Sequence, residues 1–291
     1  MPADFAVVLS APTLSEEETA AATRALEGVG AGVGPFTTDG DARYAVATAG
    51  VGLDPARLGE ARAALAGLGT GAVLVPAALR GAGRKLLIMD VDSTLIQQEV
   101  IELLAEHAGK REEVAAVTEA AMRGELDFAQ SLHARVATLA GLPVEVIEKA
   151  RAAVVLSLGA EELIAAFHAA GHIVCVVSGG FNQILDPLAA RLGLDHALAN
   201  ELEVVDGRLT GKVLGEVVDR AVKERMLRAW AGEHGIPLEH CIAVGDGAND
   251  LDMLGAAGLG VAFNAKPKVR AAADATVDLP YLDIVRHFAG V

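Results

Sequence analysis

Residues 85–94 read KLLIMDVDST, and this stretch decides the fold of the chain. The apolar run from Leu86 to Met89 is typical of a strand buried on both faces of a parallel sheet. It ends in two carboxylates, Asp90 and Asp92, followed by two hydroxyl residues. Like charges beside a buried strand are costly unless a cation or a pKa shift relieves them, and a hard divalent metal is the simplest relief. A strand followed by an ordinary polar turn is the alternative that this stretch alone leaves open.

Two other apolar runs end in polar turns. Residues 173–177 (IVCVV) precede a Ser-Gly-Gly turn, and residues 241–244 (CIAV) precede the turn GDGAND. In open α/β sheets, ligands bind at the carboxyl ends of the strands. We therefore expect the polar residues of all three turns to meet at one crevice. They are Asp90, Asp92, Ser178, Asp246, Asn249 and Asp250.

From residue 84 onward, helical patterns alternate with short apolar strands. This order predicts an α/β fold with a doubly wound, Rossmann-like parallel sheet over residues 84–291. Residues from about 97 to 157 contain no convincing strand and are interpreted as a helical cap inserted into that domain. The expected cap helices cover residues 99–107, 110–123, 127–140 and 144–153.

Residues 1–80 predict a separate small domain with the order βαββαβ, which is that of a ferredoxin-like sandwich. The expected strands lie at residues 5–9, 33–37, 44–48 and 72–75, with a turn at 38–41. One helix is expected over residues 15–28, where Ser15 is suited to cap it, and the other begins after Asp54-Pro55. Residues 81–83, Gly-Ala-Gly, are interpreted as a linker.

Composition narrows the function classes. The chain has 291 residues and a formal charge of −15, which argues against a nucleic-acid or acidic-membrane partner. It has neither a run long enough to span a membrane nor a secretory signal, so we expect a cytoplasmic protein. Cys175 and Cys241 lie in apolar runs and are interpreted as reduced core residues. The eight histidines lack a metal-binding spacing and are interpreted as surface or turn residues.

Lys223 is the candidate cation of the crevice. It lies on an expected helix between the Ser178 and Asp246 turns. A lone helical lysine is usually solvated, but this position in the order of motifs favours a role in the crevice.

Together, the segments DVDST, SGG, Lys223 and GDGAND resemble the four motifs of the haloacid dehalogenase-like phosphohydrolases. The resemblance extends over residues 84–275. Three cap segments are similar to the members of this family that hydrolyse O-phospho-L-serine. These segments are QQE at 97–99, MRGELDF at 122–128 and SLHARV at 131–136.

The resemblance implies roles for the crevice residues. Asp90 is the expected nucleophile, and Asp92 the general acid and base. Mg²⁺ is expected on the Asp90 carboxylate, the Asp92 backbone carbonyl and Asp246, with Asp250 orienting these ligands. The groups expected to bind the phosphoryl oxygens are Ser178, the Gly179 amide, Lys223 and Asn249.

The resemblance also implies how the cap selects a substrate. Glu99 is expected to bind the ammonium group of serine, and Arg135 its carboxylate. Phe128 and Met122 are expected to exclude water, and Gly180 to allow close backbone approach. Taken in isolation, Glu99 and Arg135 would more often be residues of solvated helix faces, but the complementary charges of an amino-acid substrate favour the binding roles.

The small domain resembles an ACT domain in its element order. This resemblance implies an amino-acid effector, L-serine for example, and pairing of the domains in a homodimer. The expected reaction is Mg²⁺-dependent hydrolysis of O-phospho-L-serine to L-serine and phosphate, the last step of serine biosynthesis. The alternatives are a phosphatase or phosphotransferase for another small phosphomonoester, such as phosphohomoserine or phosphothreonine, and a non-catalytic amino-acid sensor.

Overall fold

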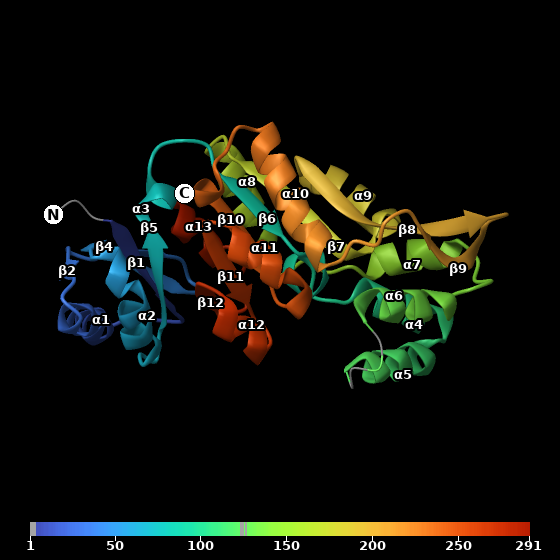
Figure 1. Cartoon of the computed structure of the whole chain (residues 1–291), viewed down its shortest axis with the longest axis horizontal. Helices are drawn as coiled ribbons and strands as arrows, with labels where there is room; N and C mark the ends of the chain where they lie inside the picture. Colours follow the sequence, from blue (N-terminus) through green and yellow to red (C-terminus); the bar gives the residue numbers. More distant parts are fainter. Residues whose placement is uncertain (1–3, 123–124, 126) are drawn as a thin grey trace.

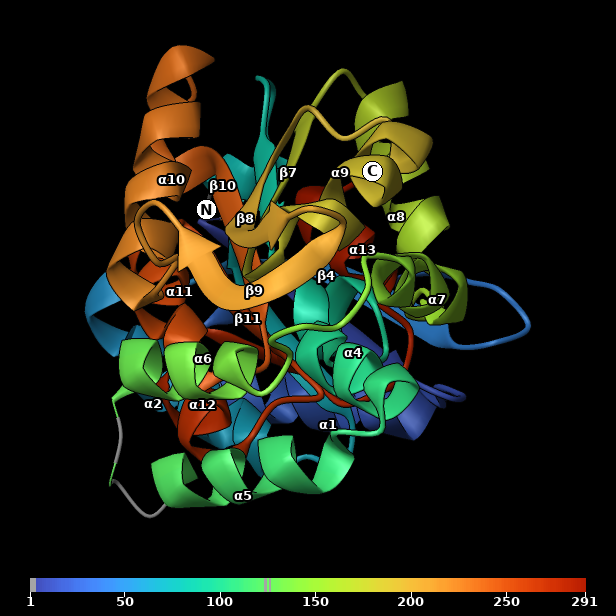
Figure 2. The ribbon, with the colours of Figure 1, turned by 90° about the vertical axis from the view of Figure 1, so that its right-hand side faces the viewer.

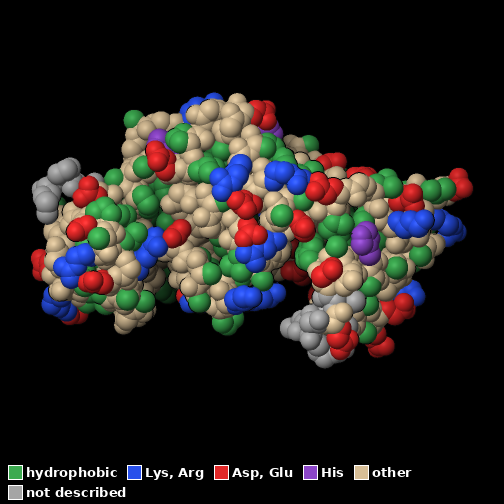
Figure 3. Space-filling model, viewed as in Figure 1, with side chains coloured by type: hydrophobic (Ala, Val, Ile, Leu, Met, Phe, Trp, Pro, Cys, Tyr) green, Lys and Arg blue, Asp and Glu red, His purple; other side chains and the backbone are tan. Residues whose placement is uncertain are grey.

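The chain folds into a small N-terminal lobe and a larger body, which a computed structural model describes for residues 4–122, 125 and 127–291 (Figure 1). The side chains of residues 119–122 also lie outside the described part. Both lobes are visible in the space-filling view, where acidic and basic side chains are interspersed on the visible face (Figure 3). No helix of the described part combines the length and the apolar character needed to cross a membrane.

The small lobe has the predicted ferredoxin-like order. Its elements are β1 (Phe5–Ala11), α1 (Glu16–Gly28), β2 (Gly32–Val33), β3 (Thr37–Gly40), β4 (Ala45–Gly52), α2 (Leu58–Ala66) and β5 (Gly71–Pro76). The antiparallel sheet has the order β2-β4-β1-β5, and β3 also pairs with β4. Ser15 caps α1 as predicted, and its side chain accepts a hydrogen bond from the Glu18 amide.

One strand of this lobe was predicted wrongly. The expected strand at 33–37 is divided between β2 and β3, and the expected turn at 38–41 is largely strand, because Thr37–Gly40 pairs with β4. All four residues of β3 are exposed. An antiparallel strand of this kind needs no apolar side chains, so its polar sequence resembles a turn.

The body contains a sheet of the order β12-β11-β10-β6-β7-β8-β9. Its strands are β6 (Leu86–Met89), β7 (Ile173–Phe181), β8 (His196–Val205), β9 (Arg208–Leu214), β10 (Cys241–Gly245), β11 (Leu259–Phe263) and β12 (Ala275–Val277). All neighbours are parallel except β8 and β9, which form an antiparallel hairpin. This is the predicted doubly wound α/β fold.

Helices cover both faces of this sheet, as the apolar sequence of β6 requires. Leu87 and Met89 pack with α8 (Ala160–Ala169), α9 (Asn182–Leu192) and α13 (Ile284–Ala289). Leu86 and Ile88 pack on the other face with α10 (Arg220–Glu233), α11 (Leu251–Ala256) and α12 (Pro267–Ala272). Both cysteines are free and buried in this core, as predicted.

The helical insertion forms the cap. It contains α4 (Val100–Ala108), α5 (Arg111–Met122), α6 (Phe128–Ala137) and α7 (Glu145–Ala153). An isolated bridge between Ile96 and Leu156 joins the two ends of the insertion. The cap helices and the β8–β9 hairpin lie together at the end of the molecule opposite the small lobe (Figures 1 and 2).

The small lobe packs against the body through the second face of its sheet. Phe5, Val7 and Leu9 of β1 face α1 and α2, whereas Val8 belongs to the core of the body. The short helix α3 (Ala77–Arg80), which was not predicted, also packs against α13.

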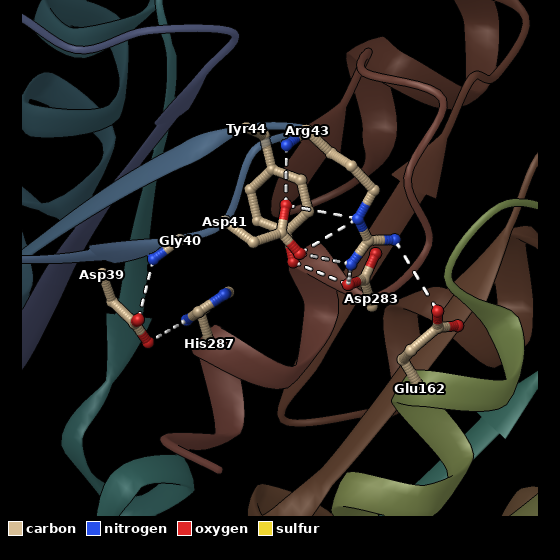
Figure 4. A network of polar contacts seen from close by, with 8 residues as sticks. All are labelled: Asp39, Gly40, Asp41, Arg43, Tyr44, Glu162, Asp283 and His287. Atoms are coloured by element: carbon tan, nitrogen blue, oxygen red, sulfur yellow. Dashed lines mark hydrogen bonds and ion pairs between the residues drawn. The ribbon is translucent and has the colours of Figure 1, made fainter.

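A polar network crosses the same interface (Figure 4). Arg43 and the Tyr44 hydroxyl both bind Oδ2 of the fully buried Asp283, at 2.7 and 2.8 Å. Nδ1 of His287 lies 3.7 Å from Asp39. His287 and His172 are buried, so the interpretation of every histidine as a surface or turn residue was wrong for these two. His172 packs edge-on against Phe167, a contact that histidine spacing does not reveal.

Candidate active site

The three predicted turns meet at one edge of the body sheet. β6 lies between β10 and β7, so the turns after β6 and β10 and the Ser-Gly-Gly segment at the end of β7 are neighbours. Asp90 directly follows β6, is 3% exposed, and accepts a hydrogen bond from the Val91 amide. The backbone then turns sharply over Val91–Leu95, where Ser93 has a φ of 55°. This turn brings Asp90 and Asp92 to the same pocket.

Lys223 lies inside the carboxylate cluster. Its Nζ is 2.7 Å from Oδ1 of Asp90 and 2.7 Å from Oδ1 of Asp250, and its side chain is fully buried. Burial by itself lowers the pKa of Lys223, but the Asp250 and Asp90 carboxylates raise it above its usual value. The lysine is therefore a fixed cation. Asp250 also accepts a hydrogen bond from the Gly247 amide through its second oxygen.

Negative charge in this cluster exceeds what Lys223 neutralises. Burial and then the Asp250 charge raise the pKa of Asp90 well above its usual value. Burial and the Glu99 charge raise the pKa of Asp92 to about 7. Burial and the Asp250 charge raise the pKa of Asp246 to about 6. Each raised pKa means that nearby positive charge does not fully offset the cost of burying that ionised carboxylate.

The same carboxylates fit a divalent cation. Carboxylate oxygens of Asp90, Asp246 and Asp250 lie within 4.8 Å of one another. This all-oxygen donor set is the kind that Mg²⁺ and Ca²⁺ prefer. Because Lys223 and the Gly247 amide already bind the two oxygens of Asp250, Asp250 is best placed to orient the cluster from behind.

The Ser-Gly-Gly segment was predicted as a turn after a strand, but it belongs to the last residues of β7, where it packs tightly against Asp92. Ser178 Oγ donates to Asp92 at 3.2 Å and accepts from the Gly180 amide at 2.7 Å. A Cβ on Gly180 would lie 3.0 Å from both Asp92 Oδ2 and Ser178 Oγ. The absence of a side chain at residue 180 thus lets this backbone approach the acid.

Asn200 positions this segment, and the sequence prediction did not include it. The buried Asn200 amide group donates to the Gly179 carbonyl at 2.9 Å, and its oxygen accepts from the Val218 amide at 2.8 Å. A lone asparagine in a strand gives no sequence signal for such a role. Its position next to the end of β7 becomes visible only in the sheet.

The cap completes the pocket, whose volume is about 160 Å³. Its described lining residues are Asp90, Asp92, Glu99, Ile101, Phe128, Leu132, Arg135, Gly179, Gly180, Asp246, Gly247, Asn249 and Lys266. Asp92 Oδ1 accepts from the Val100 amide at 2.9 Å, so the acid also binds the first residue of the first cap helix. Glu99, just before that helix, accepts from the Ser93 hydroxyl at 2.8 Å.

Most predicted site residues lie at this pocket. Phe128 and Arg135 enter it from α6, and Phe128 lies over Gly179. The Met122 side chain and Arg123 lie outside the described residues. Lys266 lines the pocket but was not predicted. It follows the end of β11, and a fourth strand end at the same edge is the signal that would have found it.

The pattern of the haloacid dehalogenase-like hydrolases matches residues 87–255, which is more than half of the chain. The chain belongs to the haloacid dehalogenase-like hydrolases. Among its curated relatives is the phosphoserine phosphatase of Streptomyces coelicolor, 58% identical over 245 residues, or 84% of this chain and 60% of the relative. That of Mycobacterium tuberculosis is 57% identical over 208 residues, or 72% of this chain and 51% of the relative. This hydrolase thus spans between half and two thirds of these relatives.

Solved structures agree with this family. A probable phosphoserine phosphatase from Vibrio cholerae in its unliganded form aligns with a TM-score of 0.79 and 37% identity. That alignment covers 98% of this chain and 86% of the other. A substrate-bound phosphoserine phosphatase complex and a phospho-aspartyl intermediate analogue of such an enzyme each align with a TM-score of 0.67 and 44% identity. Each covers 71% of this chain and 99% of the other.

Proposed function

We propose that this hydrolase converts O-phospho-L-serine and water to L-serine and phosphate, with Mg²⁺ bound and Asp90 transiently phosphorylated. The observation that carries the proposal is a buried carboxylate next to a fixed lysine, at the base of a pocket whose cap side presents Glu99 and Arg135. The substrate-bound and phospho-aspartyl structures of relatives support the same chemistry.

In the first step, an Asp90 oxygen attacks phosphorus and the bond between phosphorus and the serine oxygen breaks. Asp92 gives its proton to that oxygen, so L-serine leaves as a neutral alcohol and Asp90 carries the phosphoryl group. A pKa of about 7 suits Asp92 for this role, because a large fraction of it is then protonated near neutral pH.

In the second step, water attacks the phosphorus on Asp90. Asp92, now ionised, takes a proton from this water, and the bond between Asp90 and phosphorus breaks. Phosphate leaves, and both aspartates return to their starting protonation states. Lys223 keeps its proton throughout and stabilises the negative charge around Asp90.

Asp90, the Asp92 carbonyl and Asp246 would hold Mg²⁺, with Asp250 orienting them. When bound, the ion offsets the repulsion between the Asp90 carboxylate and the phosphate dianion. Ser178, the Gly179 amide and Asn249 would bind the remaining phosphoryl oxygens, next to Lys223. The cap residues that line the pocket, Glu99 and Arg135 among them, would then meet the amino-acid part of the substrate.

Selectivity for an amino acid rests on two cap residues of opposite charge. Glu99 would bind the ammonium group and Arg135 the carboxylate by a two-pronged contact. Phe128 and Met122 would exclude water when the cap is closed. The small pocket volume favours a substrate of this size over a macromolecule.

A phosphate-release assay tests the substrate. O-phospho-L-serine is compared with phosphothreonine, phosphohomoserine and phosphoethanolamine, with and without Mg²⁺. Phosphoethanolamine lacks the carboxylate, so Arg135→Gln should reduce kcat/KM for phosphoserine roughly 100-fold and change that for phosphoethanolamine little. The exposed Arg111→Gln is the matched control. An equal loss on both substrates would contradict the assignment of Arg135.

We further propose a metabolic step, a cellular compartment and an oligomeric state for the enzyme. It would catalyse the last step of serine biosynthesis in the cytoplasm, as a homodimer without nucleic-acid or membrane partners. Static light scattering of the full chain tests the dimer.

An amino-acid effector such as L-serine would bind at the N-terminal lobe. A cleft of about 710 Å³ between the lobes is lined by residues 10–12 of the small lobe and by Arg62, Arg270 and Asp274. A zwitterion matches these mixed charges. Calorimetric titration with L-serine and with D-serine tests this effector, since a built site should discriminate between them.

A further inference from the structure

A second group of potential metal ligands lies away from the catalytic pocket. Nε2 of His196 is 2.8 Å from Nε2 of His234 and 3.9 Å from a carboxylate oxygen of Glu233. The ligand atoms of all three side chains lie within 4.8 Å of one another. We propose that His196, His234 and Glu233 bind a transition-metal ion of the Zn²⁺ type.

The two imidazole rings can share only one hydrogen bond between their Nε2 atoms. Their Nε2 atoms face each other, so at most one can donate a proton to the other. With the protons on the Nδ1 atoms instead, both nitrogens carry lone pairs, which face each other across the 2.8 Å gap. Tetrahedral zinc with Zn–N distances of about 2.0–2.1 Å requires the nitrogens about 3.4 Å apart. The two rings must therefore separate by about half an ångström and tilt until both lone pairs point at the ion, with Glu233 and water as the other ligands.

The chemistry of this site differs from that of the catalytic cluster. Two imidazole nitrogens and one carboxylate suit Zn²⁺, Ni²⁺ or Cu²⁺, whereas Mg²⁺ prefers oxygen ligands alone. The described lining of the catalytic pocket contains no histidine. Each site therefore selects a different class of ion.

The proposed site also lies at the opposite edge of the sheet. His196 is the first residue of β8, whereas the catalytic residues lie at or just after the carboxyl ends of their strands. Glu233 is the last residue of α10, and His234 follows it. Lys223 lies in the first turn of the same helix, about 16 Å along the axis from His234. An ion here would join the end of α10 to the start of β8.

Trp230 packs against His196, one of the proposed ligands, and its fluorescence can therefore detect an ion bound there. Its ring stacks on His196 with centroids 5.2 Å apart and an interplanar angle of 12°. Trp230 is buried, which limits the rotation of the imidazole beside it. The side chain of His196 remains 22% exposed, and that of Glu233 61%, so an ion has access from solvent. The chain contains one tryptophan, so its fluorescence reports this location alone.

The test is a Ni²⁺ titration of the full chain in saturating Mg²⁺, followed by Trp230 fluorescence. Ni²⁺ is paramagnetic and quenches an adjacent indole, whereas Mg²⁺ on the carboxylate cluster does not. We expect saturable quenching that Zn²⁺ reverses by competition. His234→Gln and His196→Gln should each weaken Ni²⁺ binding by at least roughly tenfold, and Glu233→Gln should weaken it less.

His107→Gln is the matched control, because His107 is an exposed helical histidine in the cap, and it should quench like the unmodified chain. Circular dichroism establishes that each variant is folded. Since Glu233 is exposed, its variant remains informative even if a histidine variant does not fold. The proposal is overturned if Ni²⁺ up to about 1 mM does not quench. It is equally overturned if Zn²⁺ does not compete, or if His234→Gln and Glu233→Gln both bind like the control.

Discussion

Two clusters of buried charged residues, one at the lobe interface and one at the catalytic edge, balance their charge differently. At the lobe interface, one buried carboxylate, Asp283, binds a guanidinium and a hydroxyl from the small lobe. At the catalytic edge, Asp90 and Asp250 bind the buried cation Lys223, and Asp92 and Asp246 line the same pocket as Asp90. The first arrangement is nearly neutral, whereas the second raises the pKa of three carboxylates. Excess buried charge thus distinguishes a site prepared for a ligand from one that serves the fold.

The largest expected effect is on turnover. Asp90→Asn keeps the shape of the side chain but removes the nucleophile, so phosphate release should fall by at least roughly 10⁴-fold while the fold is retained. Turnover is measured with O-phospho-L-serine, and the fold by circular dichroism. Substantial hydrolysis by the variant, with deamidation excluded by mass spectrometry, would contradict a nucleophilic role.

The next effect is on stability at the lobe interface. Asp283→Asn leaves Arg43 without its buried counter-charge and should lower the free energy of unfolding by about 2–4 kcal/mol. Urea denaturation measures this change. The control is Asp41→Asn, which removes an exposed partner of the same guanidinium and should cost less. Equal losses in both variants would mean that burial does not set the difference.

At the catalytic edge, removal of a buried carboxylate charge is expected to raise the free energy of unfolding, not to lower it. The folded-state pKa of Asp246 is raised from 3.8 to about 6, so its ionised form opposes folding above that pH. In a chelator at pH 7.5, Asp246→Asn should therefore raise the free energy of unfolding by about 1–2 kcal/mol. Mg²⁺ should then stabilise the unmodified chain but not the variant. Asp186→Asn, an exposed change on α9, should do neither. A destabilised Asp246→Asn would remove the contrast between the two regions.

A smaller effect is expected on the pH dependence of kcat/KM. In the proposed first step Asp92 is protonated, so kcat/KM should fall as the pH rises through about 7. Glu99→Gln removes a charge that helps to raise the pKa of Asp92, and should move this alkaline limb about 0.5–1 pH unit lower. The pH profile of Glu102→Gln, an exposed change on α4, should match that of the unmodified chain. An unmoved limb in Glu99→Gln would rule out Asp92 as the titrating acid.

The smallest effect is expected at an exposed ion pair. Arg24 and Glu17 lie 2.6 Å apart, but their side chains are 61% and 78% exposed. Solvent screens such a pair, so Glu17→Gln should leave the urea midpoint unchanged within error. A clear shift would show that charge pairing stabilises this protein without burial.

The predictable parts of the fold were those with strong local patterns. Three apolar strands that end in polar turns predicted the catalytic edge, because parallel neighbours place their ends together. Short elements such as α3 and β12 span too few residues to show a period. Thr37–Gly40 pairs with β4 without burying a side chain, and its sequence therefore resembled a turn.

The missed contacts depend on distant parts of the chain. Arg43 and Asp283 are 240 positions apart, and nothing in either local sequence predicts their contact. Asn200 acts on the Ser-Gly-Gly segment through backbone groups, which leave no pattern of residue types. The sequence predicted that Asp90, Asp92, Ser178 and Lys223 lie close together, whereas the groups that position them required the structure.

Strand β1 has a consequence for how signals from the small lobe could reach the body. Val8 of β1 packs in the core of the body, whereas its neighbours Val7 and Leu9 pack in the core of the small lobe. Separation of the lobes would therefore expose apolar surface to water and break the Arg43–Asp283 pair. Large swinging motions between the lobes are therefore disfavoured. A molecule that binds between the lobes would therefore act through small shifts of β1, which packs against both lobes, and not through a hinge opening of the lobes.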